Sequence, residues 1–341
     1  MKDVIEVSYT GDLLAHRRCS RAWAYEKHVG FHPYEQVQAM EGRLIHHAME
    51  WMSRSFGEAH RRARHVTADE LREQLGKYFR VLWSRGIRTT FASKQDTIER
   101  VVQNLFPRET MHATVRAVIE GAKHTEYELR SVRKLLPGVA GMKQKVLLTG
   151  VLDLVVQQSS PMTYPSVYRW EDREHLTGKV ENGLLQAAVG DLEIWDYKGT
   201  RANTEYLTDY ARQLLTYAYL YRERTGQMPV RCVLYFVNEG ERASHLLAVE
   251  VDDDLVTRAV EWTRNQVNEL QDTIAICQQN PKAVIGGERL LRPANDVGKR
   301  VTTELRKQCT ACGLRFDCEE YRAHLNDPGH PDLSRTDVRK N

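Results

Sequence analysis

The chain has 341 residues, of which 41% are hydrophobic and 28% are charged, so it can bury a core and is too apolar to be disordered throughout. Its 49 Lys and Arg residues nearly balance its 46 Asp and Glu residues, and the net charge of +3 says little about partners. No apolar run approaches the roughly 20 residues of a membrane span and no export signal pattern is present, so we expect a cytoplasmic protein.

The first part of the chain is predicted to be helical and the middle to form strands. Leu44, Ile45, Ala48, Met49 and Met52 recur at helical spacing, and helical patterns continue with breaks through residues 36–122. Alternating or β-branched segments then predict strands over residues 124–132, 145–157, 192–198 and 230–238. Two later segments have the apolar spacing of helices, residues 208–225 and 252–279.

The remaining segments complete the predicted organisation. Residues 158–190 are polar and contain Pro and Gly, so they are interpreted as an inserted loop, while residues 324–341 are typical of a mobile tail. Helices followed by strands, a helix and a further strand predict an α/β (α+β) fold with a central mixed sheet flanked by helices. The order of the strands is not predicted.

The segment 192–198 places an acid and a base side by side. Alternate side chains of a strand share a face, so Asp196 and Lys198 point one way while Trp195 and Tyr197 point the other. The two rings fit a packed face, which leaves Asp196 and Lys198 on the opposite face near the strand end. An isolated pair of this kind is more often an exposed ion pair than a catalytic site.

A second carboxylate, Asp153, lies within the otherwise apolar segment 145–157. An ionised side chain buried there without a partner is costly, so Asp153 needs a cation. A divalent metal ion shared with Asp196 meets that need.

Two helical segments add candidate site residues. His46 follows Gly42 by four positions, and Gln213 and Tyr217 are four positions apart, hence on one helical face. Each residue alone has a simpler interpretation, such as a surface or capping role for His46 and a core position for Tyr217. The ordered set G-x-x-x-H, G-x-x-D, D-x-K and Q-x-x-x-Y, however, is hard to obtain by chance.

This ordered set resembles the PD-(D/E)XK nuclease superfamily and, within it, the RecB-like exonucleases. The resemblance implies a restriction-endonuclease-like sheet in which His46, Asp153 and Asp196 bind metal, the Tyr197 carbonyl adds a backbone ligand, and Lys198 is the catalytic lysine. The 43 positions from Asp153 to Asp196 exceed the compact hairpin that is usual in the family.

The resemblance also assigns Gln213 and Tyr217 to the helical motif that shapes the RecB-like site. Phosphodiester hydrolysis develops negative charge on oxygen, and Mg²⁺ or Mn²⁺ held by carboxylates stabilises that charge. An imidazole ligand suits Mn²⁺ slightly better. Lys198 is expected to orient or deprotonate the attacking water and to offset charge in the transition state.

Three of the six cysteines form a C-x₂-C-x₅-C pattern: Cys309, Cys312 and Cys318. Such spacing in a reducing compartment indicates a metal or cluster site, and we select Cys19 as the fourth ligand because Cys232 and Cys277 fit buried thiols. The arrangement is similar to the iron-sulfur site of CRISPR-associated RecB-like exonucleases and of the AddAB helicase-nuclease, which implies a [4Fe-4S] cluster. A four-cysteine zinc site is the alternative.

Basic and aromatic residues surround these cysteines in the sequence: Arg17, Arg18, Arg21, Trp23, Arg306 and Lys307. Cations that neutralise phosphates and rings that stack on bases form single-strand binding surfaces, so a DNA-binding role is predicted. A solvated basic face is the simpler alternative.

Together these features predict a metal-dependent DNA exonuclease acting at single-stranded ends in repair, recombination or defence. Segments 1–35 and 300–323 are expected to form the cluster staple, beside a helical region over 36–122 and a nuclease core over 123–299. A second hypothesis is a catalytically silent DNA-end-binding or scaffold subunit that assists a helicase or a CRISPR integrase. A third is a zinc-stapled binding protein in which the D-x-K pair is incidental.

Overall fold

The computed structural model describes residues 4–30, 37–61, 66–84, 94–107, 111–130, 145–199, 202, 204–239 and 245–279. The chain divides into two compact units. The first comprises Met1–Tyr9 and Glu35–Asn265, and the second comprises Thr10–Tyr34 and Gln266–Asn341. The predicted segments 300–323 and 324–341 lie outside the described residues.

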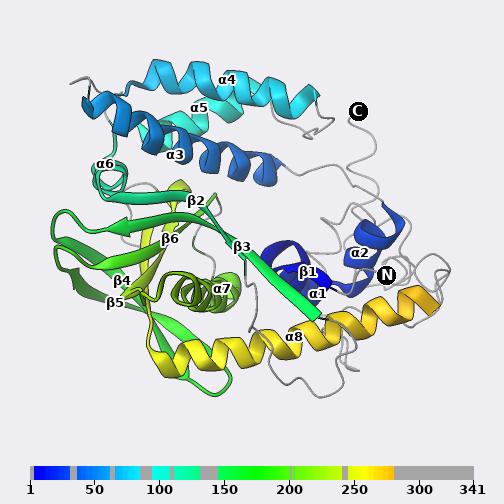
Figure 1. Ribbon diagram of the computed structural model, residues 1–341. Coiled ribbons are helices and arrows are strands. Elements are labelled where there is room, and N and C mark those ends of the chain that lie inside the picture. Colours follow the sequence, from blue (N-terminus) through cyan, green and yellow to red (C-terminus); the bar gives the residue numbers. More distant parts are fainter. Residues whose placement is uncertain are drawn as a thin grey trace, which may run out of the picture. The chain divides into compact units, whose positions relative to one another are not determined.

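The first unit is built on one sheet, which has eight strands among the described residues (Figure 1). They are β1 (Val4–Ser8), β2 (Ala122–Arg130), β3 (Lys145–Gln157), β4 (Met162–Asp172), β5 (Thr177–Ala187), β6 (Leu192–Lys198), β7 (Arg231–Phe236) and β8 (Leu246–Glu250). Their order is β1-β3-β6-β7-β8-β4-β5, and β2 pairs with β3. Since β1 with β3, β6 with β7, and β4 with β8 are parallel pairs and the others antiparallel, the predicted mixed sheet is confirmed.

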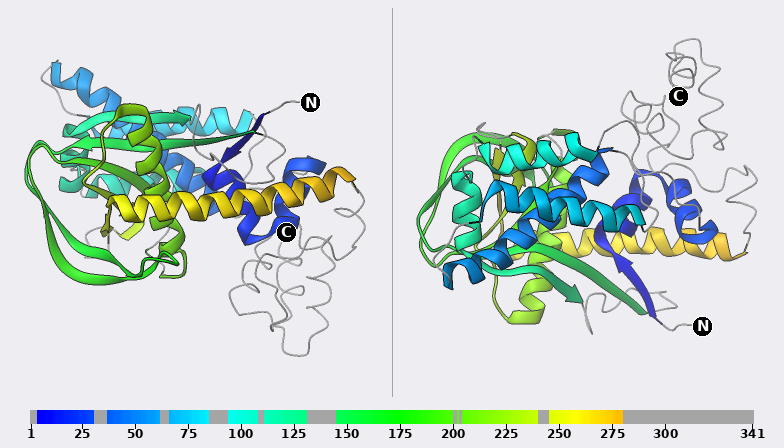
Figure 2. Two further views of the ribbon diagram at one scale, coloured as in Figure 1. Left: turned by 60° about the horizontal axis from the view of Figure 1, so that its bottom comes forward. Right: turned by 90° about the horizontal axis from the view of Figure 1, so that it is seen from above.

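Four helices, α3 (Val37–Arg61), α4 (Ala68–Ser84), α5 (Lys94–Leu105) and α6 (Ala113–Glu120), lie on one side of the sheet (Figures 1 and 2). Their apolar stripes pack with Leu154, Trp195 and Tyr197 of the sheet in one core. Helix α4 begins with a capping box, because the Thr67 hydroxyl accepts from the Glu70 N–H at 3.3 Å and the Glu70 carboxylate accepts from the Thr67 N–H at 3.1 Å.

The other side of the sheet is covered by α7 (Thr204–Thr225), against which the first half of α8 (Asp253–Gln279) packs (Figure 1). A buried hydrogen bond of 3.1 Å joins Thr216 of α7 to Thr263 of α8. Strand β6 is therefore covered on both faces, and its residues Glu193–Tyr197 are all buried. This burial explains why apolar side chains occupy both faces of the strand, with Ile194 on one face and Trp195 and Tyr197 on the other.

The segment 158–190, which was predicted to be an inserted loop, instead forms the β4–β5 hairpin and joins the sheet through the β4–β8 pair. The interpretation of Pro165 as a strand breaker was wrong. Pro165 lies where the register of the β4–β5 pair shifts, between Tyr164 and Ser166, and at such an irregularity the strand tolerates a residue without a backbone N–H. After this irregularity the buried Tyr168 and Trp170 alternate with a less buried residue between them, as side chains of a strand do.

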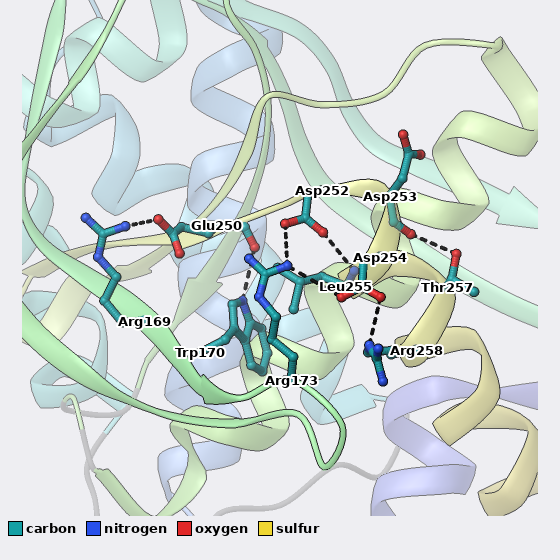
Figure 3. A network of polar contacts seen from close by, with 10 residues as sticks. All are labelled: Arg169, Trp170, Arg173, Glu250, Asp252, Asp253, Asp254, Leu255, Thr257 and Arg258. Atoms are coloured by element: carbon teal, nitrogen blue, oxygen red, sulfur yellow. Dashed lines mark hydrogen bonds and ion pairs between the residues drawn. The ribbon is translucent and has the colours of Figure 1, made fainter.

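Polar contacts hold this hairpin to the start of α8 (Figure 3). Arg169 pairs with Glu250 of β8, and Trp170 Nε1 donates to the Glu250 carbonyl at 3.2 Å. Arg173 Nη1 lies 2.9 Å from Asp252 Oδ2, and the other oxygen of Asp252 accepts the Leu255 N–H at 2.8 Å. Asp252 thus caps α8 and anchors the hairpin at once.

The described part of the second unit contains η1 (Tyr9–Leu14) from Thr10 onward, α1 (Ala15–Arg18), α2 (Ser20–Ala24), η2 (Tyr25–Val29) and the end of α8 from Gln266. His16 is buried between these elements, with Nε2 2.8 Å from the Thr273 hydroxyl and its ring edge-on to Trp23. Trp23 Nε1 donates to Asp12 at 3.2 Å. In the part of the chain that the structure describes, none of the helices is both long and apolar enough to cross a membrane.

Candidate active site

Asp196 and Lys198 lie at the end of β6 on the face opposite Trp195 and Tyr197, as the strand pattern predicts. Lys198 Nζ is 2.5 Å from Asp196 Oδ2, and the two side chains are only 14% and 6% exposed. Despite this contact, Asp196 Oδ2 accepts no well-directed hydrogen bond. The pair is therefore buried, which argues against the simple interpretation as an exposed surface ion pair.

Asp153 is brought to the same place by the antiparallel pairing of β3 with β6, in which Leu154 stands opposite Trp195. Its Oδ2 accepts the backbone N–H of Tyr197 at 2.7 Å, and its Oδ1 lies 3.1 Å from His46 Nδ1. The cation partner that a buried Asp153 requires is thus His46 in this structure, with a backbone donor as the second partner.

The charges of this cluster shift one another's pKa values. Burial alone would lower the pKa of His46, but the charge and hydrogen bond of Asp153 outweigh it and raise that pKa to about 9. Burial raises the pKa of Asp196 to about 6, and the charge of Asp153 adds to this rise although Lys198 opposes it. Burial would also raise the pKa of Asp153, but the charges of His46 and Lys198 outweigh it and hold that pKa below the ordinary value, so of the two carboxylates only Asp196 binds a proton more tightly than usual.

His46 is positioned because α3 approaches the end of β6 closely at Gly199. A Cβ on Gly199 would lie 3.1 Å from the Gly42 Cα and 3.2 Å from the Ile45 Cδ1, so the residue after Lys198 has little space for a side chain. Since Gly42 and His46 are one helical turn apart, this contact places the imidazole beside the strand end.

A polar network secures the same junction. The buried Glu41 carboxylate accepts from Asn238 Nδ2 at 3.3 Å and pairs with Arg100 at 3.4 Å. Asn238 Nδ2 also donates to the Gly199 carbonyl, and Asn104 donates to Asn238 Oδ1 at 2.5 Å. Three segments, α3, α5 and the turn after β7, are thereby tied to the end of β6. Sequence reasoning missed this network because none of its residues forms a pattern by itself.

Helix α7 supplies the other side of the site. Gln213 Oε1 lies 3.5 Å from Lys198 Nζ, and Gln213 Nε2 donates to the Tyr217 hydroxyl at 3.2 Å. Tyr217 fits because Gly150 has no side chain, since a Cβ there would lie 2.6 Å from Tyr217 Cε1. The glycine of the G-x-x-D pattern thus has a packing reason, and Gln213 and Tyr217 share one face of α7, as their spacing predicts.

Tyr210 is a site residue that the sequence analysis did not select. Its ring centroid is 4.3 Å from Lys198 Nζ. The available signal was its position three residues before Gln213, which places both residues on one face of a helix.

The donor set suits a hard divalent cation, but the side chains are not gathered around one point. Within the described ranges, three or more His, Cys, Asp or Glu side chains are nowhere placed to hold a metal ion together. His46 and Asp153 contact each other, and Asp196 contacts Lys198. The observation that fits an added cation is the donor set, because the buried carboxylates of Asp153 and Asp196 supply the hard oxygen ligands that a divalent ion prefers.

The predicted cluster and DNA-binding residues are only partly described. Cys19 caps α2, and its Sγ accepts the Ala22 N–H at 3.4 Å. The remaining predicted residues lie outside the described ranges, namely Cys309, Cys312, Cys318, Arg306 and Lys307. Arg18 is exposed, whereas Arg21 and Trp23 are each only 5% exposed, so these two pack inside the second unit and do not form the open stacking surface that was expected.

Residues 11–170 and 174–319 match the PD-(D/E)XK nuclease superfamily, and the chain belongs to that superfamily. Among solved structures, one described as a "Putative exonuclease" from Eubacterium rectale shares 8% identity with a TM-score of 0.40, covering 82% of this chain and 93% of its own. No curated protein matches the chain. Nucleases of this superfamily typically use divalent metal ions such as Mg²⁺, in agreement with the carboxylates at the end of β6.

Proposed function

We propose that this nuclease is a metal-dependent exonuclease that hydrolyses DNA from single-stranded ends. The observation that carries the proposal is the convergence of four side chains from three different elements, namely the partly exposed His46 and the largely buried Asp153, Asp196 and Lys198. A catalytically silent scaffold has no need to bury a lysine beside two carboxylates, since such a cluster costs desolvation energy.

The metal ligands in this proposal are Asp153, Asp196 and His46, with the Tyr197 carbonyl as a backbone ligand. When bound there, Mg²⁺ or Mn²⁺ supplies positive charge to the phosphoryl and leaving oxygens of the substrate. The Tyr197 N–H holds Asp153 in a fixed direction. His46 faces Asp153 and would hold a metal ion only in its neutral form.

Lys198 is the proposed catalytic residue of the chain. Its ammonium is buried beside Asp196, and the nearby carboxylates keep its pKa above the ordinary value although burial acts in the opposite direction. A lysine in this state donates hydrogen bonds, so it orients the attacking water and offsets negative charge in the transition state. Gln213 limits where the ammonium points, and Tyr217 in turn orients Gln213.

We also propose a [4Fe-4S] cluster held by Cys19, Cys309, Cys312 and Cys318, as a structural staple. The support is the cysteine spacing, and the fact that the second unit combines Thr10–Tyr34 with Gln266–Asn341, the two segments that hold these cysteines. Iron and zinc analysis with the visible absorbance of anaerobically purified protein tests it. A colourless protein that contains zinc instead of iron contradicts the cluster and leaves the nuclease proposal intact.

DNA binding is proposed for the basic residues Arg17, Arg18, Arg306 and Lys307, which lie near the predicted cluster ligands in the sequence. Arg21 and Trp23 are buried and are not included. This surface, together with a nuclease site, suits a protein that works with a helicase or a CRISPR integrase in repair, recombination or defence. A helicase encoded beside this protein favours a role in end resection, and an integrase encoded beside it favours a role in spacer processing.

The decisive experiment measures degradation of end-labelled linear and circular single-stranded DNA with Mn²⁺. Wild-type protein is compared with Lys198→Ala and Asp153→Ala, and with Lys77→Ala, which removes an exposed lysine of α4 as a matched control. We expect the wild type and Lys77→Ala to shorten only the linear substrate and the two site variants to be folded but inactive. Cleavage of circles contradicts the exonuclease mode, and binding without cleavage by every protein, with Mg²⁺ and duplex DNA also offered, supports a silent subunit instead.

A further inference from the structure

Lys198 has fewer polar neighbours than its chemistry allows. An ammonium group has three N–H donors, and among the described residues its hydrogen-bond acceptors are Asp196 Oδ2 at 2.5 Å and Gln213 Oε1 at the long distance of 3.5 Å. The aromatic ring of Tyr210 is a further close contact, with its centroid 4.3 Å from Nζ. A flexible four-carbon side chain is thus restrained on one side by a ring and not by a hydrogen bond.

The ring belongs to a continuous face of α7. Tyr206, Tyr210, Gln213 and Tyr217 are spaced by four, three and four residues, which places them along one side of a helix. Tyr206 and Tyr210 have ring centroids 6.4 Å apart, and Gln213 and Tyr217 are joined by a hydrogen bond. The face that shapes the site therefore extends two turns toward the start of α7, beyond the Q-x-x-x-Y pattern.

We propose that Tyr210 is a positioning residue, whose ring holds the Lys198 ammonium beside Asp196 in the arrangement required for phosphodiester hydrolysis. The inference rests on the proposed nuclease activity. The attraction of a cation to the face of an aromatic ring is strongest when the cation is desolvated, and Lys198 is only 14% exposed. Without the ring, the ammonium can rotate away from the carboxylate and from the path of the attacking water.

Two substitutions separate the ring from the hydroxyl group. Tyr210→Phe keeps the ring face, whereas Tyr210→Leu removes it and leaves a side chain of moderate size. The matched control is Tyr219→Leu, because Tyr219 is a half-buried tyrosine of the same helix whose ring lies 5.8 Å from the Arg222 guanidinium and not from Lys198.

Steady-state cleavage of linear single-stranded DNA is the first measurement, with the thermal midpoint recorded for each variant. We expect Tyr210→Leu to lower kcat by about tenfold or more, as misplacement of a reacting group does, with little change in KM. Tyr210→Phe and Tyr219→Leu should stay within about twofold of wild type. Equal kcat values for Tyr210→Leu and wild type, or a loss in KM alone, overturn the proposal.

Acylation of Lys198, followed by mass spectrometry, tests the same contact without any cleavage. We expect Lys198 to be modified faster in Tyr210→Leu than in wild type or Tyr210→Phe, while the exposed Lys77 serves as the internal reference. If the wild type does not cut DNA, the proposed function fails, but faster labelling still supports the contact. Unchanged labelling of Lys198 in Tyr210→Leu overturns it.

Discussion

Strand β6 carries two buried acids that differ in how the protein surrounds them. Glu193, on one face, is fully buried, and its Oε2 accepts from Tyr164 at 2.5 Å, Gln158 at 2.6 Å and Trp195 at 2.9 Å. Asp196, on the other face, contacts the Lys198 ammonium and shares its surroundings with a second acid, Asp153.

The difference lies in the kind of partner. The donors around Glu193 are neutral groups fixed by the core, and its other oxygen lies 3.4 Å from Arg231, which also pairs with Asp191 at 2.6 Å. The partners of Asp153 and Asp196 are His46 and Lys198, which can exchange or transfer protons. A buried acid surrounded by fixed donors serves stability, whereas a buried acid paired with titratable groups is suited to chemistry.

The largest expected effect is on the site acids. Asp153→Asn and Asp196→Asn each remove a charge from the proposed metal site, so cleavage should fall by about a thousandfold or more. Rates at saturating Mn²⁺ measure this, and circular dichroism shows whether each variant is folded. Glu193→Gln is the control, because it changes an acid of the same strand on the opposite face and should keep most of the activity. If Asp196→Asn is folded and has wild-type activity, Asp196 is not needed for cleavage and does not differ from Glu193 in this respect.

Truncation of Glu193 should have the largest effect on stability. Glu193→Ala leaves the buried hydroxyl of Tyr164 and the donors of Gln158 and Trp195 without their acceptor, and each unsatisfied group costs about 1–3 kcal/mol. We expect the free energy of unfolding to fall by about 3 kcal/mol or more, measured by urea denaturation. Activity per folded molecule should be retained at low temperature. A loss smaller than about 1 kcal/mol contradicts the structural role.

Gly150→Ala tests whether the close packing of Gly150 against Tyr217 affects stability and cleavage. The added Cβ meets the Tyr217 ring at 2.6 Å, so Tyr217 must move and Gln213 loses its partner. We expect a destabilisation of about 1–3 kcal/mol and slower cleavage. Gly183→Ala on β5 is the control, since nothing lies within 4 Å of its added Cβ. If the two alanine variants have the same stability and the same cleavage rate, the close packing of Gly150 against Tyr217 contributes to neither.

The smallest expected effect is a pH dependence. Burial raises the pKa of Glu193, although its hydrogen bonds act in the opposite direction. Because the folded state then binds the proton more tightly than the unfolded state, Glu193 reduces stability as the pH rises from below the ordinary glutamate pKa to above the raised one. Over this pH range the free energy of unfolding of the wild type should therefore fall more than that of Glu193→Gln. The difference between the two falls is about 1.4 kcal/mol for each tenfold by which folding increases the proton affinity of Glu193. Parallel curves for wild type and variant contradict this.

The sequence alone was sufficient for the elements whose residues follow one simple period or are apolar throughout. Strands β3 and β6 have the predicted bounds, and the helical spacing of α7 and α8 is evident in their sequences. The short strands β1 and β8 were not predicted, and the β4–β5 hairpin was predicted to be a loop. Strand β1 depends on pairing with the distant β3, and β4 and β8 on pairing with each other, which overrides weak or Pro-interrupted local preferences. Strand β5 pairs with its sequence neighbour β4.

For the site, the sequence determined which residue types are available, because G-x-x-x-H, G-x-x-D, D-x-K and Q-x-x-x-Y are patterns within single elements. The tertiary structure decided which of them meet. The register of β3 with β6 sets Asp153 beside the Tyr197 N–H, and the close approach of Gly42 to Gly199 sets His46 against Asp153. Tyr210 was recognised by its contact with Lys198. Side-chain chemistry is local to a sequence, but the distances between residues far apart in the chain are set by packing.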